Sequence, residues 1–69
     1  MIMGMTNRLR ELRLREGMTQ KETGERFGIS RNTVSRIERG EYSPTVSLAV
    51  RMAKGFSVTV EEMFCCENN

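Results

Sequence analysis

The sequence predicts an all-α fold, a single small domain built from five short helices. Apolar residues recur at three- and four-residue spacing, the second to fifth helical stretches each begin at a Ser or Thr, and glycines separate several stretches. A chain of 69 residues is enough for one domain and no more. We therefore expect one domain over residues 1–69, with its folded core in residues 6–64. The expected core residues are Leu9, Leu12, Met18, Phe27, Ile29, Val34, Ile37, Leu48, Met52, Ala53, Phe56, Val58, Val60, Met63 and Phe64.

Residues 6–16 are expected to form the first helix, because Leu9 and Leu12 lie three positions apart on one side. Gly17 then ends it, as glycine does just beyond a helix. The second helix begins after Thr19 and ends near Gly28. Its first residues, TQKE, match a capping box, in which a hydroxyl and a carboxylate satisfy each other's backbone N–H groups.

The remaining three helices follow the same rules. Ser30 is expected to cap a helix that runs to about Glu38 and stops at Gly40, and EYSP then forms a turn. Thr45 begins the fourth helix, which ends at Gly55 and Ser57. The fifth helix opens with a second capping box, TVEE, at residues 59–62. For the tail CCENN two alternatives stay open: a frayed end, or a short strand paired with MIM at the N-terminus.

The charge of the chain is unevenly distributed. Residues 1–40 hold nine Lys or Arg and five Glu, giving +4, whereas residues 41–69 hold two and four, giving −2. A basic half suggests a polyanionic partner. No apolar run approaches the roughly 20 residues of a membrane span, so we expect a cytoplasmic chain without a membrane partner.

The composition argues against an enzyme or a cofactor protein. The chain has no His and only two Cys, the adjacent Cys65 and Cys66, which do not resemble a metal site or a disulfide framework. We expect no metal, no cofactor and no small-molecule ligand, although a role for these thiols in sensing oxidants or metals stays open. Met1, Met3 and Met5 leave the start codon open as well.

Two short helices separated by FGIS at residues 27–30 fit a helix-turn-helix unit. Gly28 accommodates a left-handed turn at low cost, and Ile29 can fill the angle between the helices. The helix over residues 30–38 offers only Val34 and Ile37 to a core, and its other positions are polar. In such units the second helix lies in the major groove of DNA.

Several short motifs add a resemblance to this pattern: TQ at 19–20, GIS at 28–30, IERG at 37–40, SP at 43–44 and VTVEEMF at 58–64. Together they resemble the phage-repressor or Cro-type helix-turn-helix family, also called the xenobiotic-response-element family, over residues 6–64. The resemblance implies an all-helical regulator without catalytic activity that binds operator DNA, usually as a dimer.

The resemblance also implies a role for each matching residue in contacting double-stranded DNA. The residues expected to contact bases are Arg31, Asn32, Ser35 and Arg36. The residues expected to contact the DNA backbone are Gln20, Ser30, Thr33, Arg39, Tyr42 and Ser43. The chemistry agrees, because Arg forks onto two acceptors of guanine, Asn pairs with adenine, and helix N-termini hold phosphates.

Two structural expectations follow from the family pattern. An Arg on the first helix often pairs there with the Glu of the IE motif, so we expect a partly buried Arg13–Glu38 salt bridge. The family usually has Leu-Ala where this chain has Thr23-Gly24, and both changes should weaken the second helix. Gly in a helix interior costs about 0.5–1 kcal/mol relative to Ala. Ser57 likewise stands where the family usually has Gly.

The sequence therefore predicts a transcriptional regulator, most often a repressor, that binds a palindromic operator as a homodimer. A two-fold dimer places its two recognition helices roughly 34 Å apart. We expect the dimer contact on the fifth helix and the turn before it, at Phe56, Val58, Val60 and Phe64. The alternative is a protein-interaction module, such as the antitoxin of a toxin–antitoxin pair.

Overall fold

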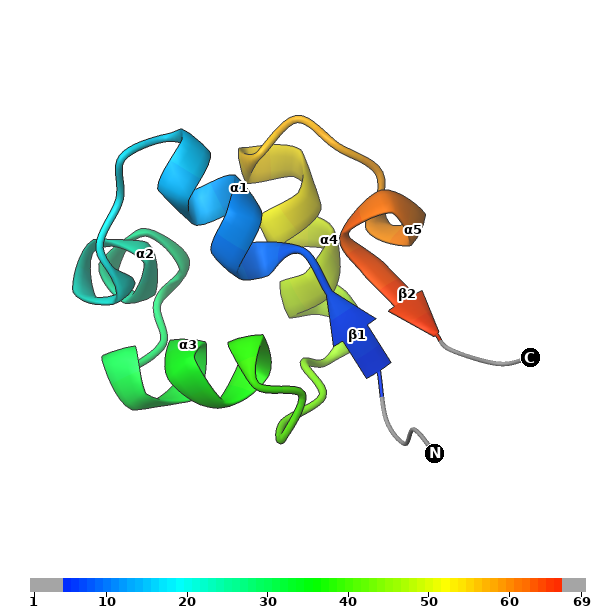
Figure 1. The fold of residues 1–69 in the computed structure, drawn as a ribbon, viewed down its shortest axis with the longest axis horizontal. Coiled ribbons are helices and arrows are strands. Elements are labelled where there is room, and N and C mark those ends of the chain that lie inside the picture. The colour runs from blue at the N-terminus through cyan, green and yellow to red at the C-terminus, as the bar shows by residue number, and fades with distance from the viewer. Residues whose placement is uncertain (1–4, 67–69) are drawn as a thin grey trace.

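The computed structural model describes the backbone of residues 5–66 and the side chains of residues 7–64. The described chain is all-α, with five helices and one two-stranded antiparallel ribbon (Figure 1). The elements are β1 Met5–Asn7, α1 Leu9–Arg15, α2 Gln20–Phe27, α3 Arg31–Glu38, α4 Val46–Gly55, α5 Val60–Met63 and β2 Phe64–Cys66. None of the helices in this part of the chain is long and apolar enough to cross a bilayer.

The helix starts after the first one are confirmed. The hydroxyls of Thr19, Ser30, Thr45 and Thr59 each accept a hydrogen bond from a backbone N–H in the following turn. Both capping boxes are complete: at α2, Thr19 Oγ1 accepts from the Glu22 N–H at 3.0 Å, and Glu22 Oε1 accepts from the Thr19 N–H at 2.9 Å. Local hydrogen bonds therefore set where these helices begin.

The first helix starts later than expected, because residues 5–7 form a strand. This strand pairs with residues 64–66 in the register Met5↔Cys66, Thr6↔Cys65 and Asn7↔Phe64. The alternative of a paired tail is correct in kind, but its partner is residues 5–7, and MIM lies outside the described residues. Asn7 marks the change from strand to helix. Its Oδ1 accepts from the Leu9 N–H at 3.1 Å, and its Nδ2 donates to the Ile37 carbonyl at 2.7 Å.

The hydrophobic core draws on all five helices. Ten of the fifteen expected residues form its buried cluster, and the other five, Met18, Ile29, Val58, Val60 and Phe64, pack against it partly buried. The rings of Phe27 and Phe56 lie 5.6 Å apart at 46°, joining α2 to the end of α4. Phe56 is only 4% exposed.

Gly24 has a role in this fold beyond its low helix propensity. A Cβ on Gly24 would lie 2.5 Å from the Ile29 carbonyl oxygen, well inside van der Waals contact. Ile29 is held close to Gly24 because the Ile29 N–H donates a hydrogen bond to the Gly24 carbonyl at 2.9 Å. Glycine at this position therefore permits the close approach of the turn before α3 to α2.

Candidate nucleic-acid interface

Helix α3 has two chemically distinct faces. Val34 and Ile37 are fully buried in the core, whereas Arg31, Asn32 and Arg36 are exposed. The turn before α3 fixes this orientation, since Gly28 adopts the left-handed conformation at φ 73°. The helix therefore rests on the domain by two apolar side chains and presents polar side chains outward.

The N-terminus of α3 is capped by Ser30, whose hydroxyl also lies close to that of Thr33. Ser30 Oγ accepts from the Thr33 N–H at 3.0 Å and lies 2.9 Å from Thr33 Oγ1. The backbone N–H groups of the first helical turn ahead of Thr33 have no partner within a helix, and such groups favour anions. The expected phosphate contacts Ser30 and Thr33 thus lie at the positive end of α3.

A buried ion pair lies where α1, α2 and α3 meet. Arg13 Nε is 2.6 Å from Glu38 Oε2, and Arg13 Nη2 donates to Glu38 Oε1 at 3.2 Å. Arg13 Nη1 also donates to the Met18 carbonyl at 3.0 Å. Both side chains are over 90% buried, so this bidentate pair is shielded from solvent.

Gln20, an expected backbone contact, belongs to the same network. Its Nε2 donates to Glu38 Oε1 at 3.1 Å, which leaves the second amide hydrogen and the amide oxygen for other partners. The side chain that opens α2 is thereby held against the end of α3. The sequence indicated each of the three residues, but not that one carboxylate connects them.

The segment after α3 turns back on the helix. The Gly40 N–H donates to the Ile37 carbonyl at 2.9 Å and the Glu41 N–H to the Arg36 carbonyl at 2.8 Å, the pattern of a Schellman motif. Arg39 forms an exposed ion pair with Glu41 at 3.2 Å.

The last two expected backbone contacts lie in this segment. Ser43 is exposed, and the guanidinium carbon of Arg36 lies over the Tyr42 ring, 5.9 Å from its centroid.

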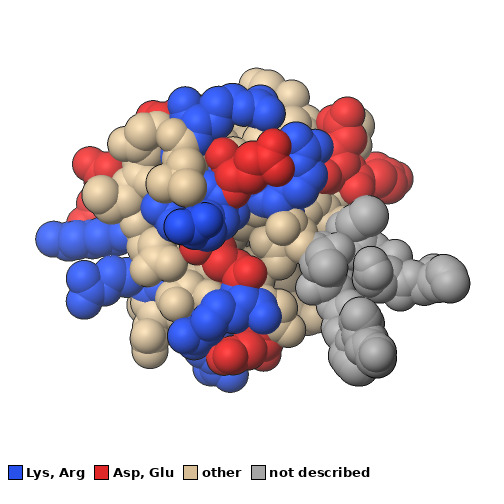
Figure 2. Space-filling view, viewed as in Figure 1, with Lys and Arg blue, Asp and Glu red and all other residues tan. Residues whose placement is uncertain are grey.

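Charge is mixed across the face that includes α1, α2 and α3. Figure 2 shows basic side chains projecting from the end of the molecule where α2 and α3 lie, while acidic side chains gather near α5. On α1, the hydrogen bond from Arg8 lowers the pKa of the exposed Glu11. The residues of the described chain hold no cluster of three potential metal ligands.

The sequence did not indicate the role of Arg26, which connects α2 to the end of α4. The guanidinium of Arg26 lies 5.5 Å from the ring centroid of Phe27 and 5.7 Å from that of Phe56, and its Nη2 donates to the Gly55 carbonyl at 2.9 Å. A single arginine in a helical stretch of sequence does not indicate contacts with two aromatic rings. Arg26 therefore links the helix-turn-helix unit to the end of α4.

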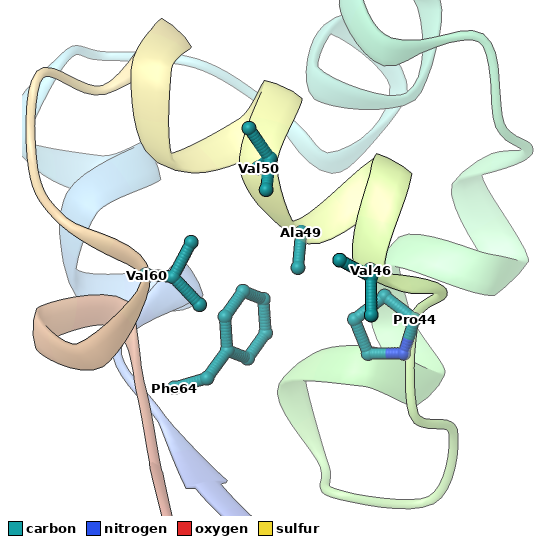
Figure 3. A pocket seen from close by; sticks show the side chains of 6 residues that line it. All are labelled: Pro44, Val46, Ala49, Val50, Val60 and Phe64. Atoms are coloured by element: carbon teal, nitrogen blue, oxygen red, sulfur yellow. The ribbon is translucent and has the colours of Figure 1, made fainter.

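An apolar groove lies between α4 and α5, separate from the exposed face of α3. It encloses about 220 Å³ and is lined by Pro44, Val46, Ala49, Val50, Val60 and Phe64. Figure 3 shows Phe64 and Val60 facing the side chains of α4 across it. Of the four residues expected in a dimer contact, Val60 and Phe64 line this groove. The expected dimer contact at Phe56 is wrong, because its ring is buried in the core. Val58 packs against the core and does not line the groove.

Comparisons with known proteins agree with this geometry. The helix-turn-helix family model matches residues 9–63, most of the chain. The chain belongs to this family of DNA-binding transcriptional regulators, of the Cro/CI type. The expected family, the all-α fold and the helix-turn-helix formed by α2 and α3 are thus confirmed.

Named relatives extend the match over nearly the whole chain. The chain is 43% identical over 63 residues to the uncharacterized HTH-type transcriptional regulator YgzD of Bacillus subtilis, covering 91% of this chain and 96% of that protein. It is 38% identical over 60 residues to an uncharacterized HTH-type transcriptional regulator of Archaeoglobus fulgidus, covering 87% of this chain and 86% of that protein.

A solved structure shows the same fold. The restriction-modification controller protein C.AhdI from Aeromonas hydrophila superposes with a TM-score of 0.70 and 29% identity, covering 80% of each chain. The names of these relatives describe regulators and a controller protein, which does not favour the antitoxin alternative.

Proposed function

We propose that this chain is a cytoplasmic repressor that binds a palindromic operator as a homodimer and reads it through the major groove. One observation carries the proposal: α3 buries Val34 and Ile37 and leaves Arg31, Asn32 and Arg36 exposed on one helix. A helix-turn-helix unit places that helix against base edges. Ser35, which is partly exposed on α3, completes the proposed base contacts.

The proposed DNA-backbone contacts surround α3 on both sides. Gln20 and Ser30 open α2 and α3, where backbone N–H groups and the helix dipole favour a phosphate. Arg39, Tyr42 and Ser43 follow α3 and are exposed, as Thr33 is in part. Because phosphate neutralisation releases counterions, the affinity for DNA should fall steeply with salt concentration.

The proposed dimer uses the apolar groove between α4 and α5. Val46 at its edge is 80% exposed, and the groove lining contains only apolar residues. A second copy that covers the groove leaves the exposed face of α3 free. Two-fold symmetry then presents two copies of α3 to one side of the DNA, which requires an operator with two related half-sites.

The test is selection of bound sequences from random duplex DNA, followed by the variant Arg31→Ala. The wild-type chain should select two inverted half-sites, and Arg31→Ala should lose about 1–3 kcal/mol of discrimination at one base position of each half-site. Unchanged discrimination in Arg31→Ala would remove Arg31 from base reading. Selection of no sequence, or of a single unrepeated site, would contradict the proposal of a sequence-specific dimer.

The sign of regulation needs a separate measurement. A reporter gene should be driven by a promoter that overlaps the selected operator. A repressor lowers its expression when the chain is produced, and an increase would show an activator instead.

A further inference from the structure

Arg36 is the one proposed base contact whose side chain rests on an aromatic ring. Its guanidinium carbon lies over the Tyr42 ring, 5.9 Å from the centroid, within the range of a cation–π interaction. Among the described residues, Arg36 forms no ion pair, and the nearby carboxylate of Glu41 pairs with Arg39 instead. Within the described part of the chain, the guanidinium of Arg36 therefore interacts with the Tyr42 ring and with no carboxylate.

The backbone between the two residues brings Tyr42 back toward α3. Gly40 adopts φ 76°, and the two hydrogen bonds of the Schellman motif turn the chain back toward Arg36. Tyr42 follows this turn and lies two residues before Pro44, whose ring restricts the backbone again. Tyr42 stays 40% exposed, so the ring forms no part of the core. Its position is explained by the turn and by the contact with Arg36, with no role in core packing.

A ring under a guanidinium restricts the arginine without using its hydrogen-bond donors. The attraction between the guanidinium charge and the face of the ring involves no particular N–H group, so the five N–H donors of Arg36 stay available. Two of these donors match the O6 and N7 acceptors of guanine in the major groove. Ordering the side chain before binding also lowers the entropy cost of fixing it on the base.

We infer that Tyr42 is a positioning residue for base reading: its ring holds Arg36 ready for a guanine in the half-site. The inference rests on the proposed function, and it replaces the expected backbone contact of Tyr42 by a different role. A phosphate contact would use the phenol hydroxyl, whereas a positioning role uses the ring. The variants Tyr42→Phe and Tyr42→Ala separate the two, because the first removes only the hydroxyl.

The first experiment tests the contact between Arg36 and Tyr42 in the protein without DNA. Tyr42 is the only tyrosine and the chain has no tryptophan, so its ring resonances are readily assigned by NMR. Arg36→Ala should shift the Tyr42 ring resonances, whereas the matched variant Arg31→Ala, which removes another exposed arginine of α3, should leave them in place. Equal shifts in both variants, or no shift in Arg36→Ala, would overturn the inference whatever the outcome of DNA selection.

The second experiment measures base preference on the selected operator. Arg36→Ala identifies the base position at which preference is lost, and that position should be a guanine. Tyr42→Ala should lower discrimination at the same position about fivefold, whereas Tyr42→Phe should preserve it. In the Arg36→Ala background, Tyr42→Ala should have no further effect at that position, because the two residues act as one unit.

Two results would overturn the positioning role while leaving the proposed function intact. One is an equal loss in Tyr42→Phe and Tyr42→Ala that is uniform across operator sequences, as a hydroxyl–phosphate contact requires. The other is additive effects of Tyr42→Ala and Arg36→Ala. Failure of the wild-type chain to select any sequence contradicts the proposed function, and the role in base reading fails with it.

Discussion

Thr23, on the buried side of α2, places a hydroxyl in the interior of the domain. The residue is fully buried, and among the residues that the structure describes its Oγ1 has no hydrogen-bond partner. A buried polar group without a partner costs about 1–3 kcal/mol. We therefore expect the Thr23 hydroxyl to lower stability relative to the leucine that is usual in the family at this position.

We expect Thr23→Val to stabilise the protein by about 1 kcal/mol, because valine keeps the shape of threonine and removes the unsatisfied hydroxyl. Urea unfolding followed by circular dichroism measures the change. The matched control is Thr45→Val, which should destabilise by about 1 kcal/mol because the Thr45 hydroxyl caps α4 through the Leu48 N–H. The same sign in both variants would contradict this account of Thr23.

At the scale of elements, the contact between α2 and α3 depends on glycine. A Cβ at Gly24 would lie 3.2 Å from the Ser30 carbonyl carbon as well as 2.5 Å from the Ile29 oxygen. These are backbone atoms of the turn, so they cannot move away as a side chain can. The helix-turn-helix geometry and the residue at position 24 are therefore directly linked.

Gly24→Ala should destabilise the protein by about 1–3 kcal/mol, because the overlap forces α3 away from α2. Helix propensity alone predicts the opposite, a gain of about 0.5–1 kcal/mol. Urea unfolding distinguishes the two, with Glu25→Ala at the neighbouring exposed position of α2 as the control. A more stable Gly24→Ala would show that the turn adjusts at little cost.

The buried Arg13–Glu38 pair connects the same elements through charge. Removing one partner leaves the other charge buried, so Glu38→Ala should cost about 3–5 kcal/mol in unfolding free energy. The double variant Arg13→Met with Glu38→Leu removes both charges and should recover much of that loss.

DNA binding by this double variant separates structure from function. If the pair matters for DNA only by positioning Gln20, the recovered protein should still bind operator DNA more weakly, since Gln20 has lost its carboxylate acceptor. Unchanged affinity in the stable double variant would show that Gln20 needs no such support.

The elements differ in how far the sequence predicts them, because they depend on contacts of different range. Each cap and capping box lies within four residues, so the starts of α2 to α5 are visible in local sequence. The pairing of residues 5–7 with 64–66 joins opposite ends of the chain and has no local mark, which explains the late start of α1. Ser57 at φ 60° shows the converse, since the fold imposes a left-handed turn without the usual glycine.

The candidate site shows the same division. The residue types on α3 could be predicted from the polar pattern and the family motifs. Their partners could not, because Gln20 meets Glu38 only when α2 and α3 are packed, and Arg36 meets Tyr42 only when the chain turns at Gly40. Phe56 fits both the expected core and the expected dimer contact by sequence, because apolar residues alone do not show which side of a short turn faces inward; the structure confirms only the core position.

At the scale of the whole molecule, a second copy of the chain is proposed to cover the groove between α4 and α5. Val46 and Ser47 lie side by side in the first turn of α4, and both are exposed, but only Val46 lines the groove. A glutamate at either position experiences the same helix terminus, so any difference between the two variants comes from the groove. The pair therefore forms a matched test of the proposed dimer.

Val46→Glu should weaken dimerisation about 100-fold. Each of the two symmetric copies loses a valine that the dimer contact buries, worth about 1.5 kcal/mol, and 1.4 kcal/mol corresponds to a tenfold change in the dissociation constant. Ser47→Glu should dimerise as the wild type does. Sedimentation equilibrium gives the dissociation constants, and circular dichroism should show the same helix content in both variants. On DNA, Val46→Glu should bind a full palindrome scarcely better than one half-site, since the linkage between two recognition helices is lost. Equal association of the two variants would place the interface elsewhere and leave this groove without a role in operator binding.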